Sequence, residues 1–251
     1  MIDLVIPVAA SSLLQFSDIK ESKEKWTGSI QFNGASASGN TNNTVVGGRF
    51  TAARTFGALT HAFDASGNFT QATLVRDGVE QRDVTQNRWH TQYRLEVNAG
   101  ERSFFYGRAR YEEDQFSGFD RQAFLGGGFG HAFAESDART FSVLIGPGVQ
   151  FLRRARPDPV PATFVMDETN FAVFLGQNYT QVLRENVTFE QSFDGTASET
   201  NSTAASRVAL KTDLTDKISS RMSYEVTHNT NPPSGRERTD TLLSASIGFQ
   251  F

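Results

Sequence analysis

From Trp26 onward, apolar and polar residues alternate along the chain with a period of two. In the last segment, Leu243, Ala245, Ile247, Phe249 and Phe251 share one face, and mostly polar or small residues share the other. Because successive side chains of a strand point to opposite faces, this pattern predicts a strand between two different environments. The pattern recurs upstream and predicts about twelve strands. The expected strands are residues 26–37, 44–56, 58–69, 87–98, 102–113, 121–133, 138–152, 169–182, 186–194, 201–213, 217–228 and 237–251.

The lengths of these strands and of their connections indicate a membrane barrel. Each strand reaches the roughly 9 to 11 residues that a tilted strand needs to cross the hydrocarbon core. Tight turns such as Gly57 alternate with longer connections at 70–86, 153–168 and 229–236. Backbone groups in hydrocarbon must all be paired, so such a sheet has to close. We therefore expect an all-β fold, an antiparallel up-and-down transmembrane β-barrel with both termini in the periplasm.

Composition excludes several other classes of protein. Only 38% of the residues are apolar, and no run approaches the roughly 18 to 20 apolar residues of a membrane-spanning helix. The formal net charge of −4 argues against a nucleic-acid partner. Cysteine is absent, which is compatible with an oxidising envelope compartment.

The N-terminal segment differs from the rest of the chain. Residues 1–24 contain a short apolar run and the small residues Val8-Ala9-Ala10, but Asp3 stands where a secretory signal carries Lys or Arg. We interpret 1–24 as an N-terminal extension or a signal remnant, with a short helix over 13–25 as one option. Residues 25–251 are expected to form the barrel.

Three sequence blocks carry a resemblance to a known family. They are WTGS at Trp26 followed by SGNT at Ser38, the central RYEEDQFSGFDRQAFLGGGFG from Arg110, and the closing NPPSGRERTD and ASIGFQF. In this order they resemble the YdiY-like family, the domain-of-unknown-function 481 group described as salt-induced outer membrane proteins. The resemblance covers nearly everything after Lys25. It implies an outer-membrane barrel and a link to salt stress, and it carries over no catalytic residue.

Two further features depend on the phase of the strands. The alternation that ends on Phe251 resembles the signal read by the barrel-assembly machinery, with Leu243, Ala245, Ile247, Phe249 and Phe251 as its residues. The opposite phase collects charged residues that would line the lumen, either as a network of ion pairs or as a narrow pore with basic residues in excess. These expected lumen residues are Arg49, Arg94, Glu96, Arg108, Arg110, Glu112, Glu190, Arg207, Lys211, Arg221, Glu225, Arg238 and Asp240.

Catalytic, metal and cofactor sites find little support. Of the four histidines, only His90 falls in the lumen phase, and no nucleophile or metal motif accompanies it. The run of glycines that begins at Gly126 lacks the Lys and helix of a phosphate loop, and it is more typical of a strand that bends or admits a close side chain. Pro147 predicts a bulge or an edge-like irregularity in its strand. The acidic residues 112–114 and Asp120 favour a solvated loop over a cation site.

The sequence therefore predicts a non-enzymatic barrel in the bacterial outer membrane, without cofactor or metal. We expect a narrow polar channel or an envelope-stress protein, and the alternative is a structural or partner-binding barrel with a charge-plugged lumen. The expected partners are outer-membrane lipids and lipopolysaccharide, the assembly machinery during biogenesis and other envelope proteins, but no nucleic acid.

Overall fold

A computed structural model describes residues 25–37, 43–76, 79–115, 119–156, 165–232 and 238–251. The segments 1–24 and 38–42, on which the N-terminal predictions and part of the family resemblance fall, lie outside the described residues. Within the described part, no helix is long and apolar enough to cross a membrane. The strands are β1 (Thr27–Ala37), β2 (Asn43–Phe56), β3 (Leu59–Arg76), β4 (Val79–Asn98), β5 (Ser103–Asp114), β6 (Phe119–Glu135), β7 (Arg139–Arg154), β8 (Asp167–Arg184), β9 (Val187–Ser198), β10 (Thr203–Asp213), β11 (Ile218–Asn229) and β12 (Thr239–Gln250).

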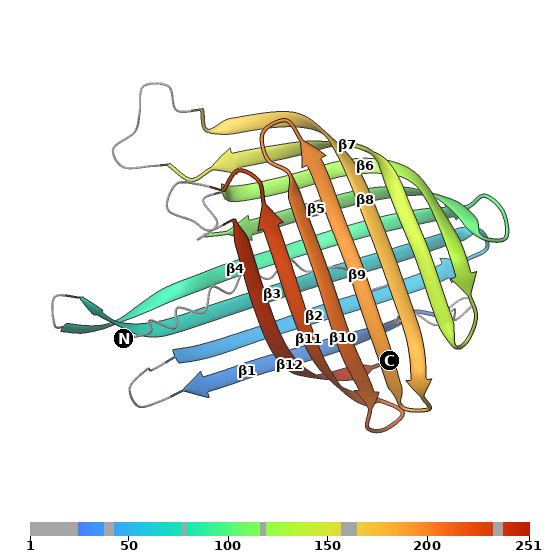
Figure 1. Cartoon of the computed structure of the whole chain (residues 1–251), viewed down its shortest axis with the longest axis horizontal. Coiled ribbons are helices and arrows are strands. Elements are labelled where there is room, and N and C mark those ends of the chain that lie inside the picture. Colours follow the sequence, from blue (N-terminus) through green and yellow to red (C-terminus); the bar gives the residue numbers. More distant parts are fainter. Residues whose placement is uncertain (1–24, 38–42, 77–78, 116–118, 157–164, 233–237) are drawn as a thin grey trace.

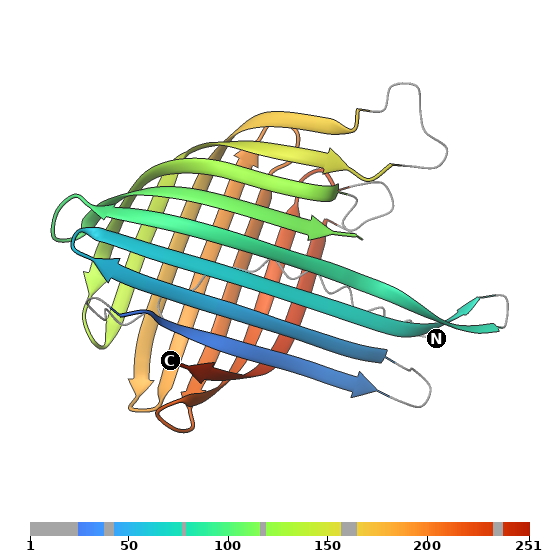
Figure 2. The same cartoon turned by 180° about the vertical axis from the view of Figure 1, so that it is seen from behind.

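The twelve strands form one closed antiparallel barrel in which each strand pairs with its neighbours in chain order (Figures 1 and 2). The first and last strands close it, with Ile30 opposite Phe249 and Phe32 opposite Ile247. Gly28 and Phe251 extend this seam by exchanging two backbone hydrogen bonds of 3.0 Å. The pairing at this seam is short, since it covers Ser29 to Phe32 of β1 and Ile247 to Gln250 of β12, but it closes the sheet, as a sheet in hydrocarbon requires. The predicted fold, a closed antiparallel β-barrel of twelve strands, is confirmed.

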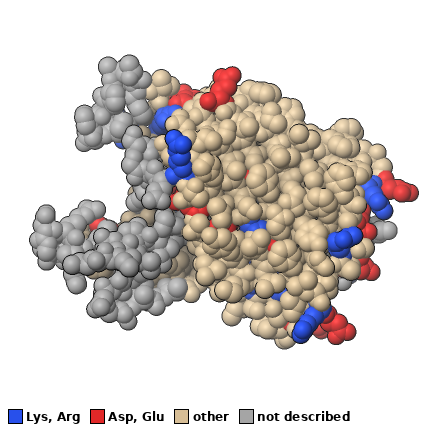
Figure 3. Space-filling view, viewed as in Figure 1, with Lys and Arg blue, Asp and Glu red and all other residues tan. Residues whose placement is uncertain are grey.

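The two faces of the wall differ as the alternation predicts. Large apolar side chains are exposed on the outside, and in β12 Leu243 and Ile247 are both 62% exposed. Polar and charged side chains occupy the opposite phase and are mostly buried. On the face drawn in Figure 3, charged residues gather toward the two ends of the barrel and leave the belt between them almost free of charge. An apolar belt with polar ends matches a lipid bilayer.

In the segment 70–86, expected to be a long loop, the described residues 70–76 and 79–86 are instead strand. β3 and β4 pair from Leu59 opposite Val97 to Arg76 opposite Val79, with a register shift after Thr70. The hairpin they form extends beyond the ends of the neighbouring strands (Figures 1 and 2). The sequence carries the signal, because Asp77-Gly78 is a dipeptide typical of two-residue hairpin turns. Polar composition alone led to the wrong expectation.

Two local predictions differ in part from the structure. Of the bulge or irregularity predicted at Pro147, only the irregularity is present: Pro147 pairs in register with Val173, and β6 and β7 keep one offset from Gly126 opposite Gly148 to Phe129 opposite Ile145. Between these two pairs the ladder lacks those of Pro147 and Gly146, because proline has no N–H. Arg238 lies just before β12 and is exposed, so it does not line the lumen.

Candidate functional site

The barrel interior gathers the charged residues that share the inner phase. Cross-strand partners in register point to the same face, so the row Ser66, His90 and Glu112 and the row Arg94 and Arg108 both lie inside. Apart from Arg238, the structure places every expected lumen residue on this inner face. These residues are Arg49, Arg94, Glu96, Arg108, Arg110, Glu112, Glu190, Arg207, Lys211, Arg221, Glu225 and Asp240.

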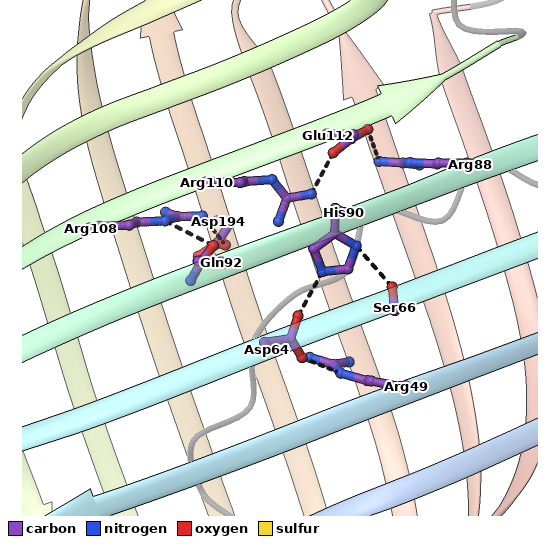
Figure 4. Close-up of polar contacts among 10 residues, drawn as sticks. All are labelled: Arg49, Asp64, Ser66, Arg88, His90, Gln92, Arg108, Arg110, Glu112 and Asp194. Atoms are coloured by element: carbon purple, nitrogen blue, oxygen red, sulfur yellow. Dashed lines mark hydrogen bonds and ion pairs between the residues drawn. The ribbon is translucent and has the colours of Figure 1, made fainter.

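A fully buried carboxylate, Asp64, organises the wall formed by β2, β3 and β4 (Figure 4). One of its oxygens accepts a hydrogen bond from Arg49 Nε at 2.7 Å, and the other lies 2.6 Å from His90 Nε2. The opposite ring nitrogen of His90, Nδ1, lies 2.8 Å from the hydroxyl of Ser66. A buried charge needs such partners because water cannot reach it. The sequence list omitted Asp64, although it alternates with the outward Phe63 and is therefore in phase.

A second charged group lies on β4 and β5, nearer the end of the barrel at which β5 ends and β6 begins. This end is called the loop end below, and the opposite end is called the turn end. Glu112 bridges Arg88 and Arg110, at 2.5 Å from a terminal guanidinium nitrogen of each, and Arg88 Nε lies 3.7 Å from Asp114 (Figure 4). Glu113, between the two acids in sequence, points outward because neighbours in a strand alternate. These acidic residues therefore do not converge on one point, and the described residues contain no group of acidic or histidine side chains suited to a metal.

One ion pair reaches across the interior. Arg108 on β5 donates from Nε to Gln92 at 3.0 Å and from a terminal nitrogen to Asp194 on β9 at 3.4 Å (Figure 4). Its guanidinium carbon also lies 4.1 Å from the ring centroid of Phe174 and 5.7 Å from that of Phe124. β5 and β9 are four strands apart in the barrel, so this contact links two separate parts of the wall.

Other inner charges pair with residues on the same strand or on a nearby strand. Arg221 donates to the fully buried Glu190 at 3.2 Å, and Arg94 lies 2.7 Å from Glu96. Arg207 donates to Ser223 at 3.1 Å and stands directly opposite Glu225. Three acids that the sequence list omitted, Asp64, Asp114 and Asp194, lie among these bases. Acids and bases in the interior are therefore close to balanced.

Apolar side chains occupy another part of the interior. Tyr106, Phe124, Leu144 and Phe174 form a buried cluster on β5 to β8, against which Phe104 packs. Glycines make room for the rings: a Cβ at Gly148 would lie 2.4 Å from the Phe124 ring, and one at Gly130 would lie 2.3 Å from the Phe104 ring. The glycine-rich stretch of β6 thus admits close side chains, as its sequence indicates.

The histidines divide as their phases predict. His61 contacts Tyr93, His131 contacts Ser103 and His228 contacts Thr239, all through outward-facing side chains. His90 alone faces inward. With Ser66 and Asp64 it has the order of hydrogen bonds found in a Ser-His-Asp triad. Here, however, the carboxylate is already shared with Arg49, and all three residues belong to two adjacent strands, as in a wall-stabilising network.

Comparison with known proteins now places the chain. A model of the family described as "Protein of unknown function, DUF481" matches residues 30–251. The chain belongs to this family. It is also 25% identical over 159 residues to "Uncharacterized protein YdiY" of Escherichia coli (strain K12), a match that spans 63% of this chain and 60% of that relative's length.

Solved structures of outer-membrane barrels share the fold. The COG4313 outer membrane channel from Pseudomonas putida F1 has a TM-score of 0.54 and 10% identity, over 96% of this chain and all of that one. The NanC porin has a TM-score of 0.52 and 10% identity, over 89% of this chain and 98% of that one. At such identities the likeness concerns the fold, a transmembrane β-barrel of the outer-membrane type.

Proposed function

We propose that this protein is a non-enzymatic channel of the bacterial outer membrane, with a narrow polar lumen that passes small solutes. The observation that carries the proposal is the inner face, which is polar or charged over most of the wall while the outer face is apolar. Water and small polar solutes are stabilised by such a lining. In this proposal the short turns and both termini face the periplasm, as in other barrels of this kind.

The narrowest part of the path is proposed to lie at Arg108. Its contact with Asp194 joins walls four strands apart, and its stacking on Phe174 fixes the guanidinium in place. The near balance of inner acids and bases favours weak ion selectivity, in place of the anion preference expected from the sequence list. A passing solute would form hydrogen bonds with side chains that are otherwise paired with each other.

Planar-bilayer conductance of the refolded protein tests the proposal. The wild type should give an ohmic current, and Asp194→Asn should raise it because the cross-lumen ion pair is lost. Arg108→Glu with Arg110→Glu should shift the reversal potential toward cations in a salt gradient. Arg139→Glu, an exposed change at the turn end, is the matched control and should leave both values unchanged. Unchanged selectivity in the double variant would remove these arginines from the path.

A second candidate function is a structural barrel whose interior is filled by its own side chains. Two features favour it: the apolar cluster around Phe174 and the buried ion pair of Arg221 with Glu190. Both fill part of the interior with side chains that contact each other. Silence of both the wild type and Asp194→Asn in the bilayer would select this candidate. A role in osmotic or salt stress, which the family resemblance implies, would then be tested by growth of a deletion strain at high salt.

A further inference from the structure

A row of charged side chains crosses the outer face near the loop end of the barrel. Trp89, Glu113, Arg121 and Arg153 are consecutive partners in register on β4, β5, β6 and β7. They point away from the lumen, and the side chains of Arg121 and Arg153 are 57% and 44% exposed. Arginine on the outer face is destabilising at mid-bilayer and well tolerated at the interface, so this row belongs at the headgroup level.

The two arginines stand directly opposite each other, which is unfavourable for like charges on neighbouring strands. Each arginine forms a long ion pair with a carboxylate: Arg121 lies 3.5 Å from Glu113, and Arg153 lies 3.9 Å from Asp167. Strong guanidinium–carboxylate bonds are about 2.7 to 2.9 Å long. Arg153 also donates to the sulfur of Met166, a weak acceptor. Each arginine is thus only loosely paired with a carboxylate, so that N–H donors remain for a further acceptor.

An open hollow of about 470 Å³ lies over this row. Besides the two arginines, its lining includes the indole of Trp89, the amides of Asn87 and Gln115, and the carboxylates of Glu113 and Asp120. Glu113 is held in place by the hydroxyl of Tyr111 at 2.6 Å and by the indole N–H of Trp89 at 3.2 Å. Toward the middle of the barrel, the next row places the small Ala123 between Tyr111 and Phe151.

This combination of groups fits a phosphorylated sugar better than a simple phosphate. Paired guanidinium groups bind a phosphate through several charge-assisted hydrogen bonds. Carboxylates and amides accept hydrogen bonds from sugar hydroxyls, whereas a carboxylate repels a bare phosphate. An aromatic side chain offers an apolar face beside a polar edge. The apolar belt directly below, with Phe151 45% exposed, suits acyl chains.

We propose that Arg121, Arg153 and Trp89 form a binding site for a phosphorylated glycolipid headgroup of the lipid A type, held at the loop end of the barrel. The phosphate lies between the two arginines, and the sugar lies over Trp89 beside Glu113. The site rests on the barrel being in the outer membrane with its loops outside, and it does not depend on whether the lumen conducts.

Trp89 provides the readout. In a Trp26→Phe background it is the single tryptophan, so titrating the refolded protein in micelles with lipid A should change its fluorescence. Arg121→Gln with Arg153→Gln should weaken this binding by about tenfold or more, since several charge-assisted hydrogen bonds are lost. Arg139→Gln with Arg184→Gln, exposed changes at the turn end, is the matched control and should bind like the parent.

Two further ligands separate the components of the site. Dephosphorylated lipid A should bind about as weakly as lipid A binds to the double variant. Phosphatidylglycerol, which has a phosphate without a sugar, should bind more weakly than lipid A. Equal binding of phosphatidylglycerol and lipid A would overturn the glycolipid assignment, and equal binding of lipid A by parent and double variant would overturn the site. Heat-modifiable gel mobility confirms that each variant is folded.

Discussion

The interior of the barrel has two sectors that stabilise the same wall with different chemistry. The charged sector comprises the groups around Asp64 and Glu190, with Arg49, His90 and Arg221 as their partners. The aromatic sector is the cluster of Tyr106, Phe124, Leu144 and Phe174. Arg108 belongs to both, because it pairs with Asp194 and stacks on Phe174.

The difference teaches what each sector can tolerate. A buried charge depends on specific partners, so the loss of one group leaves another without compensation. Packed rings do not depend on specific polar partners. In the aromatic sector, substitutions are instead restricted by the space available where glycines lie beneath the rings. Single substitutions should therefore have their largest effects in the charged sector.

The largest effect is expected for Asp64→Ala. It leaves Arg49 and His90 without their shared carboxylate in a site from which water is excluded. Breaking a buried ion pair from one side costs about 3–5 kcal/mol. Urea unfolding of the refolded barrel in lipid vesicles, followed by tryptophan fluorescence, measures the free energy of unfolding.

Two variants control this measurement. Asp216→Ala removes an exposed carboxylate in a turn and should change stability by less than about 0.5 kcal/mol. Arg49→Leu combined with Asp64→Leu replaces both partners by apolar groups and should cost less than Asp64→Ala alone. A double variant as unstable as the single one would show that the loss does not come from an uncompensated charge.

The next effect concerns space in the aromatic sector. In Gly148→Val, the new Cβ would lie 2.4 Å from the Phe124 ring and 2.9 Å from a backbone oxygen. Overpacking of this kind typically costs about 1–3 kcal/mol. The same urea titration measures it, and Phe124→Leu in that background should recover part of the loss.

Gly107→Val is the matched control for this change. Gly107 is exposed on β5, and an added Cβ meets nothing within 4 Å there. Valine also suits a strand better than glycine, so stability should stay equal or rise. If both valines were equally destabilising, the cause would be the backbone of the glycine-rich strands and not the rings.

The sequence predicts the strands and their inward faces better than it predicts the contacts within the two sectors. Alternation predicts the number of strands and the inward phase of residues such as Arg49 and Glu190, because the two-residue period directly reports which face is apolar. It says nothing of which strands meet across the lumen. The contact of Arg108 with Asp194 depends on closure and on the registers of the twelve strand pairings, so no local pattern contains it.

Some omissions had a readable signal. Asp64 and Asp194 are in the inward phase of their own strands, so the alternation places them inside like the acids that the prediction included. The Asp77-Gly78 hairpin signal was likewise present in the segment expected to be a loop. Arg238 shows the opposite error, since phase was extended past the first residue of β12. The only sequence signal for the aromatic sector is its glycines. Each leaves space for an aromatic ring of the same or the next strand, but the sequence does not say which ring fills that space.

A smaller effect is expected for Ser66→Ala in the charged sector. It removes one hydrogen bond, of 2.8 Å to His90, and leaves the contact of His90 with Asp64 intact. One such bond contributes about 1 kcal/mol. Channel conductance should stay unchanged if Ser66 only supports the wall. A loss near that of Asp64→Ala in the urea titration would mean that the hydroxyl holds the entire group together.

The smallest effect, and one of opposite sign, is expected for Tyr106→Phe. The Tyr106 side chain is 5% exposed in the aromatic sector, and within the described residues its hydroxyl has no hydrogen-bond partner. Removing a buried hydroxyl without a partner relieves a desolvation cost, so stability should rise by up to about 1 kcal/mol. Tyr179→Phe, where the exposed hydroxyl donates to Gln181, should change it little. A clear loss of stability in Tyr106→Phe would mean that this hydroxyl is bonded to the charged residues beside it. Tyr106 would then belong to both sectors, as Arg108 does.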